Sequence, residues 1–180
     1  MPWRTNAMPD HPRTKPVNPP ASPPCLAHGL PAQPFAADEL LAYLNDMLES
    51  ERAGARGLSQ LSKTVGLPAF ANLFLDLAKD EGRFCVMLRK HIGRLGGVPS
   101  DATGKFYDKL LAREGLVAQL SLLDRGQAAV VISLTAALPR LRDAELHADL
   151  DEMLDAHVRN IDVANAAAAA WLPVDPAPGV

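Results

Sequence analysis

The pattern of apolar and polar residues changes character near residue 36. From Asp38 onward, apolar side chains recur at intervals of three and four residues, and no useful length of chain shows the strict alternation of a half-buried strand. Apolar residues at this spacing line one face of an α-helix, so the sequence predicts an all-α domain. Four long helices are expected, over residues 38–66, 68–96, 114–141 and 143–170.

Prolines and glycines set the expected ends of these helices. Pro68 is tolerated in a first turn, the Gly96-Gly97 pair stops the second helix, and Pro139 bends or ends the last turn of the third. Short connections make the first two helices antiparallel neighbours, and likewise the last two, which predicts an antiparallel four-helix bundle. A short amphipathic segment at residues 106–111 predicts a small extra helix in the connection between the second and third helices. That connection, about 17 residues, is long enough to cross the bundle, so an up-down-up-down and a crossover topology are both open.

Each predicted helix carries one polar interruption in its apolar stripe. The interruptions are Glu51, Glu81, Gln127 with Asp124 beside it, and His157, and they fall near the midpoints of the four spans. Helix midpoints lie at about one height in antiparallel packing, so these side chains are expected to converge in a single layer. A buried carboxylate without a partner costs several kcal/mol, so the layer needs a cation, mutual hydrogen bonds or water.

The two ends of the chain differ from the helical part in composition. Residues 1–35 hold ten of the sixteen prolines, which fit neither a helix interior nor a central strand. We therefore expect a disordered proline-rich tail at 1–35, the bundle at 36–172 and a disordered C-terminal tail at 173–180. The proline-rich tail is either a tether for an unidentified partner or a solvated extension.

Charge and cysteine usage exclude several classes of function. The net charge is −3 and no long run of Lys or Arg is present, so neither nucleic acid nor an anionic membrane is expected as a partner. The longest apolar runs are too short to cross a bilayer, and the N-terminus lacks the apolar core of a secretory signal. Cys25 and Cys85 fall in a predicted tail and a helix interior, which makes a disulfide between them improbable. These features predict a cytoplasmic protein.

Two stretches resemble the ferritin-like superfamily, the group that includes bacterioferritin and rubrerythrin. Residues 44–51 (LNDMLESE) are similar to the first-helix signature whose last glutamate ligates iron. Residues 80–84 (DEGRF), continuing through 87–92 (MLRKHI) to 95–100 (LGGVPS), are similar to the second-helix signature and its following turn. The resemblance covers the four helices and implies a ferritin-like bundle of an uncharacterised branch.

The resemblance also implies a di-iron site, and the sequence departs from it. The superfamily takes a glutamate from each of two helices and a Glu-x-x-His pair from each of the other two. Here the second helix has Phe84 where the histidine belongs, and the fourth has Leu154 where the glutamate belongs. Glu51, Glu81 and His157 remain, and the third helix offers Asp124 or Gln127, so the implied site is a degenerate one.

Three hypotheses about function follow. In the first, Glu51, Glu81 and His157, with Asp124, Gln127 or water, bind one iron or manganese ion, and the protein is a mononuclear metal-binding protein or oxidoreductase. In the second, the layer is a buried hydrogen-bonded cluster with an arginine such as Arg56 or Arg125, and the bundle is a non-catalytic scaffold or binding module. In the third, the lost polarity opens an apolar pocket for a small organic ligand.

Other features carry narrower predictions. Residues 128–138 are apolar on more than one helix face, which predicts a homodimer through helix faces. His91 and His147 lie near helix ends, where a histidine is typically a solvated cap partner. Cys85 is expected to behave as a small hydrophobic residue rather than as a thiolate ligand. Arg52 and Arg56 are expected on a charged outer face.

Overall fold

Five α-helices and one short 3-10 helix make up the part of the chain that the computed structural model describes, residues 32–171. No strand occurs in that part, which confirms the all-α prediction. The elements are α1 (Ala37–Thr64), α2 (Pro68–Arg94), α3 (Phe106–Leu111), α4 (Leu116–Ala137), the 3-10 helix η1 (Leu138–Arg140) and α5 (Ala144–Trp171). The four long helices and the short extra helix are those that the sequence predicts.

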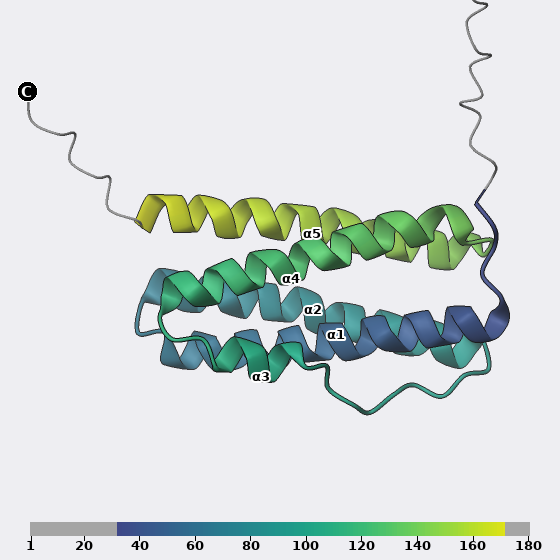
Figure 1. The fold of residues 1–180 in the computed structure, drawn as a ribbon, viewed down its shortest axis with the longest axis horizontal. Coiled ribbons are helices and arrows are strands. Elements are labelled where there is room, and N and C mark those ends of the chain that lie inside the picture. The colour runs from purple at the N-terminus through teal and green to yellow at the C-terminus, as the bar shows by residue number, and fades with distance from the viewer. Residues whose placement is uncertain (1–31, 172–180) are drawn as a thin grey trace, which may run out of the picture. The chain divides into compact units, whose positions relative to one another are not determined.

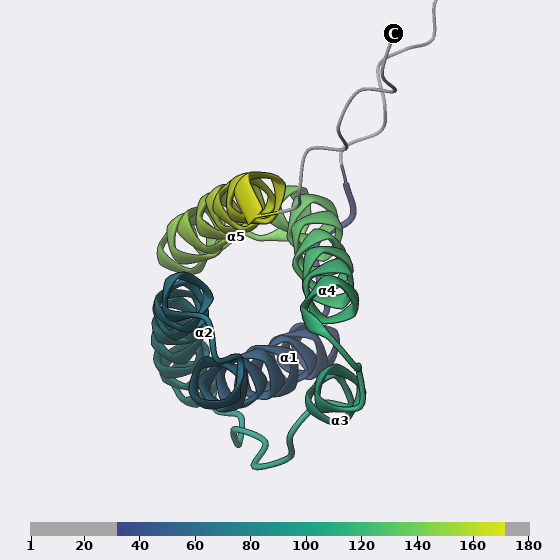
Figure 2. The ribbon, with the colours of Figure 1, turned by 90° about the vertical axis from the view of Figure 1, so that its left-hand side faces the viewer.

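The four long helices form an antiparallel bundle with a crossover connection. Helix α1 packs along α2, α4 packs along α5, and α5 also packs on α2. Viewed along the bundle, the helices follow one another around a ring in the order α1, α2, α5, α4, so α1 faces α5 and α2 faces α4 across the axis (Figure 2). Figure 1 shows that α2 and α4 run in the same direction, which means that the chain returns along the bundle between them. The crossover topology is therefore the correct one of the two that the sequence leaves open.

The crossover connection is fastened to α1 by polar side chains. The Ser100 N–H donates to Asn45 Oδ1 at 2.7 Å, and the Ser100 hydroxyl donates to a carboxylate oxygen of Glu49. The guanidinium of Arg52 donates to the backbone carbonyls of Ser100 and Ala102. These bonds satisfy backbone groups that a long loop would otherwise leave to solvent. Arg52 thus binds the connection between α2 and α3 to α1, whereas the sequence predicts it on a charged outer face.

Helix α3 fits between α1 and α4 because two glycines let it approach. A Cβ on Gly57 would lie 2.9 Å from Leu110 Cδ2, and a Cβ on Gly126 would lie 2.7 Å from Phe106 Cε2. Leu110 is fully buried as a result. The guanidinium of Arg56 lies over the ring of Tyr107 at 5.0 Å from its centroid, which adds a contact on the outside of α3.

The core is divided into two apolar clusters by four buried polar side chains, Glu51, Glu81, Gln127 and His157, which we call the polar layer. Each long helix contributes apolar residues on both sides of its polar residue, as the interrupted stripes in the sequence predict. One cluster is built on Leu44, Met47, Leu48, Phe84, Leu88, Ile92, Leu134, Leu138, Leu141, Leu146, Leu150, Met153 and Ala156, and the other on Leu58, Leu61, Phe70, Phe74, Leu77, Ala78, Leu110, Leu120 and Leu123.

The predicted boundaries need two adjustments. Helix α4 begins at Leu116 and ends at Ala137, where Pro139 forces the last turn into the 3-10 helix η1. Residues 32–35, assigned to the tail from composition, lie against the bundle: the Phe35 N–H donates to the Arg140 carbonyl, and the Arg140 guanidinium lies 3.8 Å from the Phe35 ring centroid. The predicted tails at 1–31 and 173–180 lie outside the described residues.

His91 is fully buried, contrary to the prediction of a solvated cap partner. It lies where α5 closes over the last turns of α2, with Nε2 2.6 Å from Asp149 Oδ2 and Nδ1 3.1 Å from an Arg94 guanidinium nitrogen. A guanidinium can only donate, so Nδ1 accepts and the Nε2–H donates to Asp149. Arg94 also pairs with Asp143 at 2.7 Å, and together these contacts tie α2 to the start of α5.

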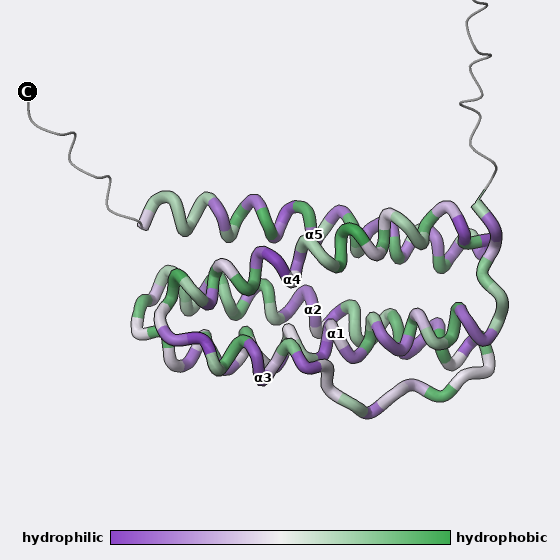
Figure 3. The backbone as a smooth tube through the Cα atoms, viewed as in Figure 1, coloured by the Kyte–Doolittle hydropathy of each residue, from purple (hydrophilic) through white to green (hydrophobic). Residues whose placement is uncertain are grey.

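Hydrophobic and hydrophilic stretches are interspersed along the helices (Figure 3). Among the described residues, no helix combines the length and the hydropathy that crossing a bilayer requires.

Candidate functional site

The polar layer brings together one side chain from each long helix at the middle of the bundle. Glu51 and His157 are each 1% exposed, Glu81 is 3% exposed and Gln127 is 4% exposed. The convergence follows from the antiparallel packing that the sequence predicts, because each residue stands near the midpoint of its helix. All four side chains are removed from water, so their partners within the protein decide their protonation and their chemistry.

Glu81 and Gln127 form one half of the layer. The Gln127 side-chain Nε2 donates to Glu81 Oε1 at 2.7 Å, which joins α2 to α4. The second carboxylate oxygen of Glu81 occupies space that α1 leaves at Gly54, because a Cβ on Gly54 would lie only 1.8 Å from Glu81 Oε2. The glycine is therefore required for the close approach of the carboxylate to the α1 backbone.

Glu51 and His157 form the other half. His157 Nε2 lies 3.4 Å from Glu51 Oε1, which joins α1 to α5, and His157 Nδ1 lies 2.9 Å from the Met153 carbonyl oxygen. A carbonyl can only accept, so Nδ1 carries a hydrogen, and Nε2 is the position of the ring that faces the carboxylate. His157 Nε2 and Glu51 Oε1 are then two acceptors that face each other. Their lone pairs repel, so a proton or a cation is needed between them. Glu51 Oε2 and His157 Nε2 have no hydrogen-bond partner within the described residues.

The two pairs cross the bundle on its two diagonals. In the ring of Figure 2, α1 stands opposite α5 and α2 stands opposite α4. The Glu51–His157 contact spans the first diagonal and the Glu81–Gln127 hydrogen bond spans the second. A longitudinal slip of any one helix by a turn would separate one pair, so the layer fixes the register of all four helices.

Burial decides the ionisation of the layer. Burial, and next the charge of Glu51, raise the pKa of Glu81 well above its usual value, although the bond from Gln127 opposes this shift. Burial also raises the pKa of Glu51, against the influence of His157. For His157, burial alone would lower the pKa, but the Glu51 carboxylate beside it raises it overall. The layer therefore holds protons that the same groups would release in water.

Apolar side chains stand at positions 84 and 154, where the resemblance in the sequence implies ligands. Phe84 is buried, with its ring centroid 5.6 Å from that of His157, and the half-buried Leu154 packs against the first apolar cluster. Two bridged iron ions need about six protein ligands. Within residues 32–171, no three histidine, cysteine, aspartate or glutamate side chains are placed to hold one metal ion. The donor set therefore does not fit a di-iron centre.

The remaining candidates lie outside the layer. Asp124 is on the side of α4 that faces α5, where its Oδ1 accepts from Asn165 Nδ2 at 3.2 Å, so Gln127 is the residue that α4 contributes. Arg56 donates to the Thr103 hydroxyl and Arg125 to the Ser121 hydroxyl, so neither serves as the counter-charge considered from the sequence. Cys85 is half-buried and burial raises the pKa of its thiol to about 11, in keeping with a small hydrophobic residue.

Asn160 is a buried polar residue that the sequence analysis missed. It lies on α5 three residues after His157, and its side-chain nitrogen has no hydrogen-bond partner among the described residues. The signal was present in the sequence, because position 160 falls on the same apolar stripe as Met153, His157 and Ala164. The stripe of the fourth helix is thus interrupted twice.

Comparison with a solved structure supports the bundle. The chain is similar to a structure described as "Crystal structure of ferritin like, diiron-carboxylate proteins from Bacillus anthracis str. Ames", with a TM-score of 0.65 and 18% sequence identity. The match covers 72% of this chain and 95% of the other. At this identity the likeness shows the fold, which is ferritin-like. None of the curated protein sequences matches the chain.

A family model matches most of the described part. Residues 38–167, which run from the first turn of α1 to the last turns of α5, match the family described as "Domain of unknown function (DUF6306)". The matched residues include all four members of the polar layer, Glu51, Glu81, Gln127 and His157. The chain belongs to this family, with a ferritin-like bundle as its fold.

Proposed function

We propose that this chain is a non-catalytic ferritin-like scaffold whose polar layer is closed by protein groups and protons instead of metal ions. The hydrogen bond of 2.7 Å from Gln127 Nε2 to Glu81 Oε1 carries this proposal. This donor gives the buried carboxyl of Glu81 a partner within the protein, so the carboxyl does not need a cation to be satisfied.

The apolar side chains at the substituted positions support the same proposal. Phe84 and Leu154 fill space with carbon where ligands would stand, which lowers the local polarity and raises the cost of burying a di-positive ion. The raised pKa of Glu81 has the same consequence, because a protonated carboxyl is a poor ligand.

A scaffold of this kind has a defined physical role for the layer. The two diagonal pairs set the register of the helices, and the apolar clusters on either side supply the stability. The function then lies on the outer surface of a rigid bundle. We expect the protein to act as a homodimer in the cytoplasm, where Cys85 stays a thiol.

A second candidate function is binding of one iron or manganese ion. The contact between Glu51 Oε1 and His157 Nε2 favours it, because 3.4 Å is the separation of two ligands at about 2.0–2.1 Å from a tetrahedral ion. The hydrogen bond from Nδ1 to the Met153 carbonyl orients the imidazole, as a hydrogen bond from the unligated ring nitrogen does for histidines that bind metals. Glu51 and His157 would hold the ion and Glu81 would be the third protein ligand, provided that Gln127 releases it. The similar structure is described as a diiron-carboxylate protein, which favours metal chemistry in this fold.

Metal analysis of the purified protein separates the two candidates. The full chain is loaded with iron or manganese, freed of loosely bound ions, and analysed for metal content and for the melting temperature with and without a chelator. The scaffold proposal predicts far less than one ion per chain and a melting temperature that the chelator leaves unchanged. One ion per chain, lost in Glu51→Ala and retained in Asp46→Ala, would establish the metal candidate and overturn the scaffold proposal.

A further inference from the structure

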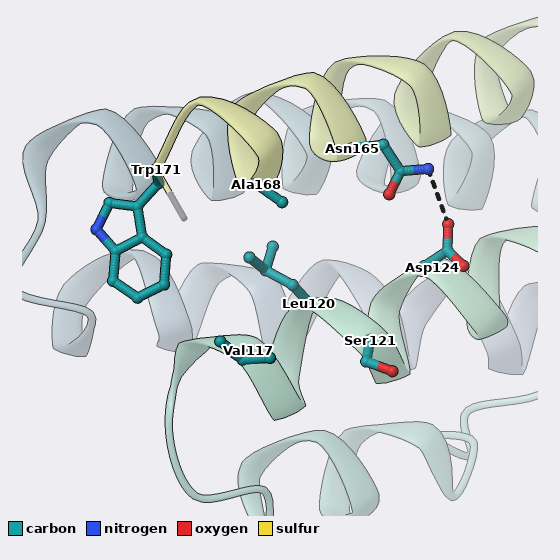
Figure 4. Close-up of a pocket in the computed structure, with 7 residues that line it drawn as sticks. All are labelled: Val117, Leu120, Ser121, Asp124, Asn165, Ala168 and Trp171. Carbon is teal, nitrogen blue, oxygen red and sulfur yellow. Dashed lines mark hydrogen bonds between the residues drawn. The ribbon is translucent and has the colours of Figure 1, made fainter. Parts of the chain in front are cut away.

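A pocket opens between the start of α4 and the end of α5. Figure 4 shows the seven side chains that line it, which come from these two helices alone. We call it the Trp171 pocket. Its volume is about 200 Å³, enough for a ligand of roughly seven non-hydrogen atoms at about 30 Å³ for each water displaced. The lining residues are Val117, Leu120, Ser121, Asp124, Asn165, Ala168 and Trp171.

One end of the pocket is an aromatic and aliphatic wall. The indole of Trp171 packs edge-on against Phe70 of α2, with ring centroids 5.8 Å apart and an interplanar angle of 83°. This contact limits the movement of the ring although Trp171 is half exposed. Leu120 and Ala168 extend the wall between the indole and the polar end of the pocket (Figure 4). The wall offers a ligand apolar surface at this end of the pocket.

The other end of the pocket is a carboxylate. Asp124 accepts one hydrogen bond, from Asn165, which leaves its second oxygen free (Figure 4). Within residues 32–171, no basic side chain forms an ion pair with Asp124. The nearest fixed positive charge that the lining residues contact is Arg125, which is exposed and donates to the Ser121 hydroxyl at 2.7 Å. The pocket therefore combines a negative charge with an aromatic wall, the two features that attract an organic cation.

We propose that the Trp171 pocket binds a small free alkylammonium ion, with the charged nitrogen toward Asp124 and its alkyl groups against Leu120, Ala168 and the indole of Trp171. The carboxylate attracts the charge, and the alkyl groups replace water on the apolar wall. The site goes beyond the scaffold function and does not depend on it, because no member of the polar layer lines the pocket.

Choline and its uncharged isostere 3,3-dimethyl-1-butanol test the proposal, because they share a shape and differ in charge. The chain has two tryptophans, so a Trp3→Phe variant leaves Trp171 as the single tryptophan reporter. We expect choline to change the Trp171 fluorescence with a Kd in the millimolar range, and to bind at least about fivefold more tightly than the isostere, which corresponds to about 1 kcal/mol. Equal affinity for the two compounds, or no response to choline up to about 0.1 M, would overturn the proposal.

Two aspartate variants locate the charge, with binding followed by ligand-observed NMR. Asp124→Asn keeps an acceptor for Asn165 and should weaken choline binding at least about fivefold while leaving binding of the isostere unchanged. Asp155→Asn makes the same change in net charge at an exposed position of α5 outside the pocket, and should leave both affinities unchanged. Equal losses in the two variants would mean general charge attraction and would refute a site at Asp124. Circular dichroism checks that each variant keeps its helices.

A choline group can also belong to a lipid, and a vesicle experiment distinguishes that source. Phosphatidylcholine vesicles should not retain the protein in sedimentation, because the proposed ligand is the free ion. Retention by the vesicles without any response to free choline would contradict the proposal.

Discussion

Gly54→Ala is the substitution that tests the geometry of the polar layer most directly. It adds one methyl group in the interior of α1, and this group would lie 1.8 Å from Glu81 Oε2 and 2.5 Å from Glu81 Cδ. Heavy atoms cannot approach so closely, so the Glu81 carboxyl must move. Its bond with Gln127 holds it in place, and moving it leaves a buried amide without an acceptor.

Three contributions determine how much Gly54→Ala changes the free energy of unfolding. Alanine is a better helix former than glycine, which stabilises the variant by up to about 1 kcal/mol. Overpacking of the core costs about 1–3 kcal/mol, and the loss of a buried hydrogen bond costs about 1–3 kcal/mol. The net expectation is a destabilisation of about 1–5 kcal/mol, with about 3 kcal/mol as the central value. For a bundle of this size, the central value corresponds to a fall of about 6–12 °C in the melting temperature.

Gly82→Ala is the matched control. Gly82 lies inside α2, and a Cβ there would meet no atom within 4 Å. The same chemical change should therefore stabilise the protein by about 0.5–1 kcal/mol, since only the helix propensity and the unfolded-state entropy act. Urea unfolding at equilibrium measures both variants, and an unchanged m-value shows that the denatured states are comparable.

A double-mutant cycle assigns the effect to Glu81. In a Glu81→Ala background the clash is absent, so Gly54→Ala should become neutral or stabilising, with a coupling energy of at least about 2 kcal/mol. If Gly54→Ala were as stable as the unchanged protein, or if it cost the same in both backgrounds, the carboxyl of Glu81 would not occupy this space. The reasoning about a layer closed at Gly54 would then be wrong.

Three further predictions concern the pH dependence, the lost ligands and the outer surface. Because the pKa of Glu81 is raised, the folded protein keeps a proton that the unfolded chain releases above about pH 4.5. The free energy of unfolding should therefore fall as the pH rises from there toward the pKa of Glu81 in the folded state. The fall should be at most about 1.4 kcal/mol per pH unit. The Glu81→Gln side chain stays neutral, so urea unfolding at several pH values should show this variant becoming more stable relative to the unchanged protein as the pH rises. If the difference in free energy of unfolding stayed constant with pH, the pKa of Glu81 would not be raised. Phe84→His combined with Leu154→Glu completes both Glu-x-x-His pairs, so elemental analysis should find bound iron and a chelator should lower the melting temperature only in this variant. Ile132 is 70% exposed on the uncharged part of α4. If the predicted homodimer uses this face, light scattering should show the Ile132→Asp variant as a monomer. Val86→Asp, a similar change on α2, should leave the molar mass unchanged.

Much of the site could be predicted because a buried stripe tolerates few polar residues. Glu51, Glu81 and His157 stood out as interruptions of apolar stripes, and the antiparallel packing placed them at one height. The pairing within the layer could not be predicted, because it depends on which helices stand opposite each other. Gly54 was missed for the same reason, since its role is defined only by the Glu81 carboxyl from another helix.

The ends of the bundle show the same limit. The sequence offered His91 as a solvated residue near a helix end, and the packing of α5 over α2 buries it beside Asp149 and Arg94. Asp124 and Gln127 are three residues apart, and the sequence left open which of them belongs to the layer. The rotation of α4 about its axis turns Gln127 inward and Asp124 toward α5, and a rotation of this kind is set by side-chain packing across the whole helix.

The sequence by itself determined the four long helices, the short helix at Phe106–Leu111, the division of the core by polar residues and the apolar residues Phe84 and Leu154 beside that division. Each of these is a local property, fixed by periodicity, by proline and glycine positions, or by the chemistry of one side chain. Only the tertiary structure decided the crossover topology, the two diagonal pairs and the Trp171 pocket. These depend on contacts between residues far apart in the chain, whose geometry follows from how whole helices pack and not from any single segment.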